Sequence, residues 1–115
     1  MAPRGWDNNN GEEKLYGLIG KMLVLPGQRD ALIDILVEGL GTMPGCLSYV
    51  VARDPADPDT VWVTEVWDSK ASHEASLSLA SVRDAIARGR PMIAGSGERY
   101  ETDPVGGHGL VNDAA

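Results

Sequence analysis

The stretch Val61-Trp-Val-Thr-Glu-Val-Trp67-Asp-Ser-Lys-Ala71 decides the fold of this chain. β-Branched and aromatic residues fill six of its first seven positions, a composition typical of a strand. Asp68 and Ser69 then offer side-chain oxygens that cap the N-terminus of a helix. We therefore predict a strand over residues 61–67 that leads directly into a helix over residues 70–80.

The residues before this stretch predict two further strands with a helix between them. The strands fall at residues 15–25 and 46–53, and Pro26-Gly27 closes the first. The helix begins after Gln28 and ends at Gly41. Its apolar stripe has helical spacing and consists of Leu32, Ile35, Leu36 and Leu40.

The residues after it predict a broken helix and a last strand. Ser81-x-x-Asp84 resembles a capping box that opens a second helical segment, which Gly89 and Pro91 close. Residues 97–103 form the fourth strand. The order is therefore β-α-β-β-α-β, typical of a ferredoxin-like α+β fold. Right-handed connections place the helices on one face of a four-stranded antiparallel sheet.

The length of 115 residues predicts one domain. We place it at residues 15–103. Residues 1–14 are polar without a period, and residues 104–115 are rich in glycine, so both are expected to be flexible tails.

Composition excludes several classes of function. A net charge of -7 argues against nucleic acid or an anionic membrane surface as partner, because a basic face binds polyanions. A single cysteine excludes an internal disulfide framework and a zinc site built on paired cysteines. The chain has no apolar run of the ~20 residues that span a bilayer and no secretory signal, so we expect a cytoplasmic protein.

The strand over residues 61–67 is apolar on both faces. Val61, Val63 and Trp67 point one way, while Trp62 and Val66 point the other. An antiparallel sheet with one face in water alternates with polar residues instead. The simplest second cover is another copy of the chain about a two-fold axis. We predict a homodimer in which the two sheets meet face to face.

Residues 15–100, about three-quarters of the chain, resemble the antibiotic biosynthesis monooxygenase superfamily of small dimeric α+β-barrel proteins. The likeness rests on Pro26-Gly27 before the first helix, on Pro44-Gly45-Cys46 before the second strand, and on Glu65-Val-Trp67-Asp-Ser-Lys-Ala71. It implies a monooxygenase that needs neither cofactor nor metal. Such an enzyme binds a hydroxylated aromatic, quinol or anthrone in an apolar cleft, where the deprotonated substrate itself gives an electron to O₂.

Three residues are candidates for handling the proton. Histidine exchanges protons near neutral pH, and His73 is the only histidine of the predicted domain. Glu65 shares a strand face with Trp67, where a carboxylate is costly unless it is paired or hydrogen-bonded. Tyr49 lies within the second strand. Each also has an ordinary structural interpretation: a solvent-facing histidine, an interface ion pair and a core tyrosine.

The remaining candidates would bind the substrate. The resemblance places Trp67 in the wall of the cleft, although a core tryptophan is the structural alternative. Arg90 could stabilise an anion, or it is a solvated helix end. The other candidates are Met22, Ser76, Leu77 and Tyr100.

The resemblance leaves other activities open. In the haem-degrading branch and in some oxygenating branches, the helical histidine falls near Ser76, and these branches also have an asparagine in the first strand, which residues 15–25 lack. Haem degradation is therefore not implied. A non-catalytic binding or stress-response module, or an isomerase or decarboxylase of the related barrel, would use the same cleft.

Overall fold

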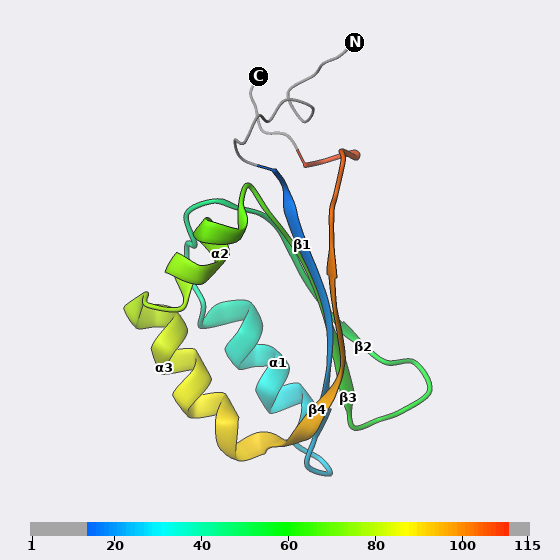
Figure 1. Ribbon diagram of the computed structural model, residues 1–115. Coiled ribbons are helices and arrows are strands. Elements are labelled where there is room, and N and C mark those ends of the chain that lie inside the picture. The colour runs from blue at the N-terminus through cyan, green and yellow to red at the C-terminus, as the bar shows by residue number, and fades with distance from the viewer. Residues whose placement is uncertain (1–13, 111–115) are drawn as a thin grey trace.

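The computed structural model describes residues 14–110, in which three α-helices cover one face of a four-stranded antiparallel sheet (Figure 1). The strands are β1 (Tyr16–Val24), β2 (Cys46–Arg53), β3 (Thr60–Trp67) and β4 (Ile93–Thr102). The helices are α1 (Arg29–Glu38), α2 (Lys70–Ser76) and α3 (Ala80–Gly89), and a 3-10 turn, η2 (Arg90–Met92), follows α3. The predicted ferredoxin-like α+β fold is confirmed. Residues 1–13 and 111–115 of the two predicted tails lie outside the described residues.

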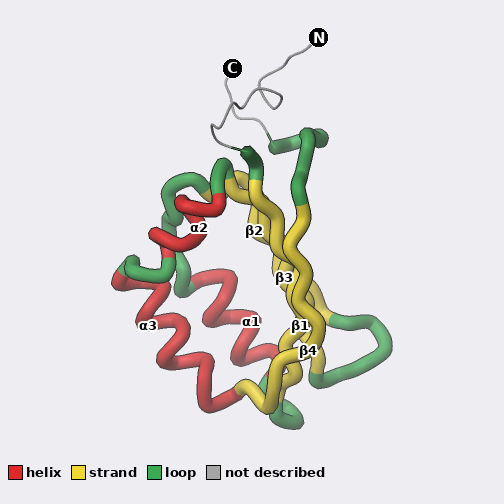
Figure 2. The backbone as a smooth tube through the Cα atoms, viewed as in Figure 1, coloured by secondary structure: helices red, strands yellow, loops and turns green. Residues whose placement is uncertain are grey.

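The sheet has the strand order β2-β3-β1-β4, so β1 and β3 are its central strands (Figure 2). Trp67 pairs with Tyr16 of β1 and with Cys46 of β2, and Glu65 pairs with Leu18 and Tyr49. Side chains of directly paired residues share a face of the sheet. The register therefore places Trp67, Glu65, Tyr16 and Tyr49 on one face, the face that the helices cover.

The predicted broken helix exists, but the predicted cap of its second segment was wrong. Ser69 caps α2 as predicted, since its Oγ accepts a hydrogen bond from the Ser72 N–H at 3.1 Å. Helix α2 ends at Ser76 rather than at residue 80, and Leu79, not Ser81, is the N-cap of α3. The Ser81 hydroxyl donates instead to the Leu40 carbonyl at 2.7 Å. This hydrogen bond holds the start of α3 against the segment that follows α1.

Two other boundaries differ from the prediction by more than one residue. Helix α1 ends at Glu38, with Gly39 as its C-cap, where Gly41 was expected. Strand β4 begins at Ile93, four residues before the expected start at residue 97. Ile93 favours a strand, but Ala94, Gly95 and Ser96 after it are poor strand formers. This segment pairs with β1 across two register shifts, so the neighbouring strand and not propensity decides its structure.

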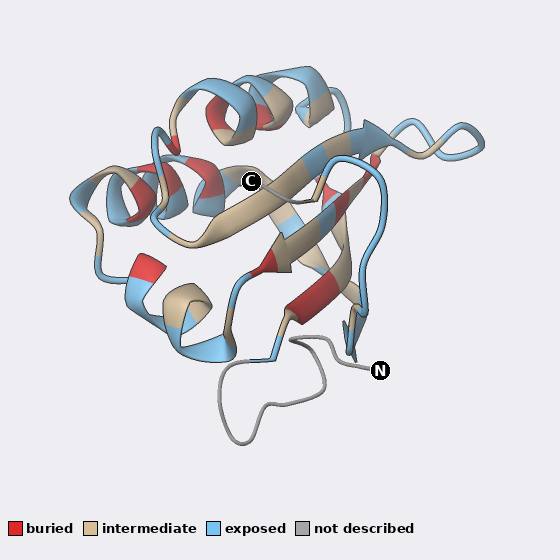
Figure 3. Cartoon of the chain, turned by 90° about the horizontal axis from the view of Figure 1, so that it is seen from above, coloured by how far each residue is buried: buried red, intermediate tan, exposed pale blue. Residues whose placement is uncertain are grey.

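The core lies between the helices and the sheet, and Figure 3 shows buried residues in both layers. The side chains of Trp67, Leu32 and Val61 are almost completely buried there. Burial of these apolar surfaces holds the helices against the sheet. None of the helices within residues 14–110 is long and apolar enough to span a membrane.

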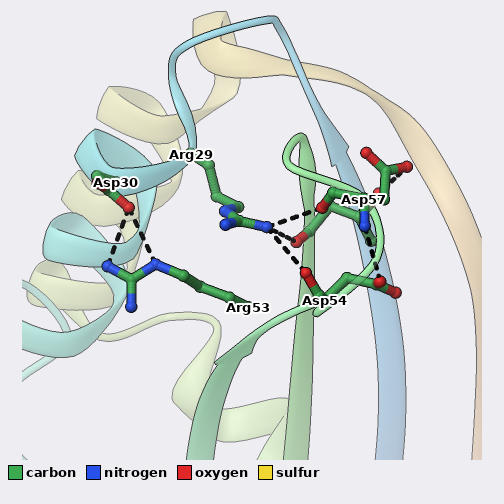
Figure 4. Close-up of polar contacts among 6 residues, drawn as sticks. Arg29, Asp30, Arg53, Asp54 and Asp57 are labelled. Atoms are coloured by element: carbon green, nitrogen blue, oxygen red, sulfur yellow. Dashed lines mark hydrogen bonds and ion pairs between the residues drawn. The ribbon is translucent and has the colours of Figure 1, made fainter.

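Arg29, the first residue of α1, ties that helix to the loop between β2 and β3 (Figure 4). Its Nη1 donates to the carbonyl oxygens of Asp54, Asp57 and Thr60 at 3.2, 2.8 and 3.3 Å. Next to it, Arg53 of β2 pairs with Asp30 of α1 at 3.0 Å. These contacts hold the end of α1 that lies farther from Trp67. They anchor the helix against the sheet, where it forms one wall of the cavity next to Trp67.

Candidate functional site

A cavity of about 440 Å³ lies between the helices and the sheet. Its lining comes from all three helices and all four strands, and most of it is apolar. This volume falls within the range of small-molecule sites. Eight of the nine predicted site residues line it, namely Met22, Tyr49, Glu65, Trp67, His73, Ser76, Leu77 and Arg90. Their roles stay predictions, but the structure brings them together.

Trp67 and Glu65 form a fixed pair on β3. The indole is 1% exposed, and its Nε1–H donates to Glu65 Oε1 at 2.8 Å. The two residues are neighbours on one face of the strand, which explains the contact. The hydrogen bond satisfies the buried indole N–H and also holds the carboxylate in an apolar wall. Part of the indole lines the cavity, so Trp67 belongs both to the core and to the site.

His73 enters the site from α2. Its imidazole packs against two aromatic rings, with its centre 5.3 Å from that of Trp67 in an edge-on arrangement and 5.6 Å from that of Tyr16. Ser76, one turn later, donates its hydroxyl to the His73 carbonyl at 2.6 Å and is buried. Leu77 follows at the end of the helix and is about half exposed. The histidine is therefore a residue of the cavity wall rather than a solvated helix residue.

Tyr49 projects from β2 toward the same cavity. Burial raises the pKa of its phenol, and the nearby negative charge of Glu65 raises it further. The phenol therefore keeps its proton at neutral pH. In this state it can donate a hydrogen bond to an oxygen of a ligand, but it cannot act as a base.

Arg90 and Met22 also line the cavity, but they belong to elements that do not carry Tyr49, Glu65 or His73. Met22 lies on β1, and Arg90 is an exposed residue at the end of α3. Tyr100 does not reach the cavity, so the prediction that it binds substrate there was wrong. It pairs with Ile19, three residues from Tyr16, and side chains alternate along a strand. Tyr100 therefore lies on the opposite face, 53% exposed.

Sequence reasoning missed the residues that create the empty space. Ala85 and Gly89 line the cavity from α3, four residues apart and on one helix face. A Cβ at Gly89 would stand 3.0 Å from Leu32 Cδ1, so a larger residue there would fill part of the space. The signal was a pair of small residues at helical spacing on a face that otherwise carries Val82 and Ile86.

The Tyr16 hydroxyl makes a further hydrogen bond near this site, to Glu101 Oε2 at 2.5 Å. Burial, followed by the bond and charge of Glu101, raises the pKa of Tyr16 from 10.0 to about 12. Stability from this phenol is therefore complete below pH 10 and is lost as the pH rises toward 12. The same hydrogen bond, with the charge of Lys70 beside it, lowers the pKa of Glu101.

We expect this titration to appear in urea unfolding at high pH. Between about pH 9 and about pH 11, the wild-type free energy of unfolding should fall by about 1 kcal/mol more than that of Tyr16→Phe. The comparison cancels the titration of lysines, which both proteins share. Parallel pH profiles of the two proteins would contradict the assignment.

Within residues 14–110, no group of three or more histidine, cysteine, aspartate or glutamate side chains is arranged to hold a metal ion. Cys46 is half-buried, and burial raises the pKa of its thiol. Its Sγ lies 3.6 Å from the Ser48 carbonyl, which satisfies the thiol within its own strand.

Comparison with known proteins relates this arrangement to a family. The model of the family described as "Antibiotic biosynthesis monooxygenase" matches residues 15–88. These residues hold β1 and all that follows it up to the last residue but one of α3, and with them every residue of the site apart from Gly89, Arg90 and Ile93. No curated protein matches this chain.

Solved structures with the same fold have similar sizes. A protein of Chloroflexus aurantiacus J-10-fl, named after the same family, is 71% identical with a TM-score of 0.82, and the match covers 84% of this chain and 99% of that one. A protein of Caulobacter crescentus CB15, also so named, is 20% identical with a TM-score of 0.71, covering 82% and 92%. One from Pseudomonas aeruginosa is 21% identical with a TM-score of 0.68, covering 81% and 96%. The last two likenesses concern the fold alone.

Proposed function

Because the chain belongs to the antibiotic biosynthesis monooxygenase family, we propose that it oxygenates a hydroxylated aromatic compound, such as a quinol or an anthrone, without a cofactor. The observation that supports this proposal best is the cavity itself. It is apolar, it is large enough for a ring system, and it holds His73, Glu65 and Tyr49 against an indole wall. An apolar site that carries few polar groups suits a planar aromatic ligand.

The reaction begins with removal of a proton. His73 accepts the proton of the substrate, because an imidazole nitrogen in the cavity wall is the group best suited to act as a general base. Glu65 is engaged by the Trp67 indole, and Tyr49 keeps its proton, so both are less suited to be the base. The Tyr49 hydroxyl donates a hydrogen bond to the substrate oxygen and stabilises its negative charge.

The deprotonated substrate then reacts with O₂. It gives one electron to O₂, and the resulting radical and superoxide combine to form a carbon–oxygen bond. For an anthrone, the peroxide at the former methylene carbon loses water, which leaves a carbonyl. One oxygen atom enters the product, and the other leaves as water with the two methylene hydrogens. The apolar walls exclude bulk water from the reactive anion.

Oxygen uptake tests this function. Protein treated with a chelator is mixed with a panel of reduced quinones and anthrones under labelled oxygen gas, and the product is analysed by mass spectrometry. The expected result is uptake above the buffer blank, with one labelled oxygen atom in each product molecule. If the compounds raise the melting temperature of the protein but are not converted, the protein is a binding module. If they are converted in the absence of oxygen, it is an isomerase or a decarboxylase. Either result would overturn the proposal.

We also propose that the protein acts as a homodimer through the face of the sheet opposite the helices. The three helices lie on one side of the sheet (Figure 1). The other face carries apolar side chains that a single chain leaves in contact with water, among them Val50 and Tyr100, each 53% exposed, and Leu23, 36% exposed. Ile19 and Val66 lie between them on the central strands. A second sheet would remove these surfaces from water.

A charge in the middle of this face is expected to separate the subunits. Ile19→Glu places a carboxylate on central strand β1, where burial against a second sheet would leave it without a partner. Light scattering should give twice the monomer mass for the wild type and the monomer mass for the variant. Val37→Glu, on the exposed side of α1, is the control and should stay dimeric. A wild-type protein that is monomeric at micromolar concentration would refute the dimer.

A further inference from the structure

Tyr16 does not line the cavity, but its ring contacts the ring of His73, which does. Its ring is 8% exposed and stands 5.6 Å from the imidazole, centre to centre. The other aromatic neighbour of the imidazole is Trp67, on the cavity side. Within residues 14–110, the imidazole nitrogens have no hydrogen-bond partner. The direction in which the ring of His73 points therefore depends on packing against these two neighbouring aromatic rings.

The ring of Tyr16 is itself held in place at both ends. Its backbone belongs to central strand β1, and its hydroxyl donates to Glu101 of the neighbouring strand β4. The Lys70 ammonium lies 3.7 Å from the same carboxylate oxygen and 5.8 Å from the centre of the Tyr16 ring. Lys70 and His73 are one turn apart on α2. Helix α2 thus rests on Tyr16 through two side chains, one of which is the histidine of the site.

A second cavity, of about 390 Å³, lies on the far side of Tyr16. Polar and charged side chains line much of it, including Lys70, Glu101 and Asp103. Tyr16 lines this cavity, and His73 lines the apolar one. The Tyr16–His73 contact therefore forms part of the wall between a polar space and an apolar space. Without the phenol ring, the imidazole would be free to turn away from the substrate and toward the polar side.

We propose that Tyr16 is a positioning residue, which holds the imidazole of His73 toward the substrate cavity while Glu101 and Lys70 hold Tyr16. This inference rests on the proposed function for its effect on turnover, but the orientation of His73 is measurable without turnover. Tyr16 acts through the histidine and touches no substrate. Its removal is therefore a loss of alignment, which lowers kcat more than it changes KM.

The experiment combines nuclear magnetic resonance of the His73 ring with kinetics. In Tyr16→Leu, the ring signals of His73 should shift because the phenol ring current is gone, and its contacts to Trp67 in nuclear Overhauser spectra should weaken. With an active substrate, kcat should fall by about tenfold or more, with KM nearly unchanged. Tyr16→Phe keeps the ring but loses the hydrogen bond to Glu101, and should give smaller changes in the same direction.

Two controls separate positioning from loss of stability. Leu18→Val removes buried volume from the same core cluster without contacting the cavity, and Tyr100→Phe removes a hydroxyl from the other face of the sheet. Both should leave the His73–Trp67 contacts and kcat unchanged. If Tyr16→Leu does not fold, Tyr16→Phe decides the question.

Two results would overturn the proposal: His73–Trp67 contacts that stay intact without the phenol ring, or a Leu18→Val variant with the same losses as Tyr16→Leu. An inactive wild type would refute the proposed function instead. In that case the resonance measurements alone would decide whether Tyr16 positions His73.

Discussion

We expect His73→Gln to lower kcat by about 100-fold or more, because removal of a general base costs about this much. Glutamine is close to histidine in size and polarity, but its amide cannot accept a proton at neutral pH. The effect should fall on kcat rather than KM, since the apolar walls and the indole remain to bind the substrate. Steady-state oxygen uptake at several substrate concentrations measures both constants.

Glu74→Gln is the matched control for this variant. Glu74 is the next residue on α2, is exposed and does not line the cavity, so its kcat should equal that of the wild type. Glu65→Gln provides the comparison within the site. Its amide oxygen can still accept the indole N–H, so Trp67 stays in place and the loss should be smaller. A larger loss in Glu65→Gln than in His73→Gln would assign the base to Glu65 and contradict our assignment.

The second large effect is expected from Ile86→Trp, which should abolish substrate binding. Ile86 lines the cavity from α3 and is 41% exposed, so it stands where the cavity meets the surface. An indole at this position occupies space that the substrate needs, while an exposed position accepts the larger side chain with little loss of stability. Isothermal titration with a substrate or a stable analogue measures the change in Kd.

Ala87→Trp is the control because it places the same side chain on the same helix. Ala87 is exposed and does not line the cavity. Its affinity for the ligand should remain that of the wild type, and the two variants should have similar melting temperatures. Equal binding by Ile86→Trp and the wild type would show that the ligand enters elsewhere.

The fold was predictable from the sequence because its signals are local. The β-branched and aromatic residues of 61–67, the Ser69 cap and the stripe of Leu32, Ile35 and Leu36 each act within one element. Their order then left few possible topologies. The boundaries that were wrong depend on distant partners, namely the Leu40 carbonyl for Ser81 and the pairing with β1 for the first residues of β4.

The site was predictable where residues share a strand face, as Glu65 and Trp67 do. The site was not predictable where it depends on which residues of neighbouring strands pair with each other. Tyr100 lies outside the cavity because it pairs with Ile19, whose side chain is on the face opposite the helices, and no pattern within one strand reveals this pairing. Tyr16 was overlooked because its contact with His73 joins residues 57 positions apart, which no local pattern reveals.

The fold alone does not fix the chemistry of this family. Structures about 20% identical to this chain share its architecture. The chemistry of this chain depends on the content of its cavity: an indole tied to a carboxylate, a histidine packed against two aromatic rings, and a phenol that keeps its proton.

Oxygen consumption by chelator-treated wild type, Ile86→Trp and Ala87→Trp, recorded in parallel with one substrate, tests most directly whether the helix-side cavity is where the substrate reacts. We predict that the wild type and Ala87→Trp consume oxygen at the same rate, and that Ile86→Trp does not exceed the buffer blank. Equal rates in all three proteins would place the reaction outside this cavity, and no uptake by any of them would contradict a monooxygenase.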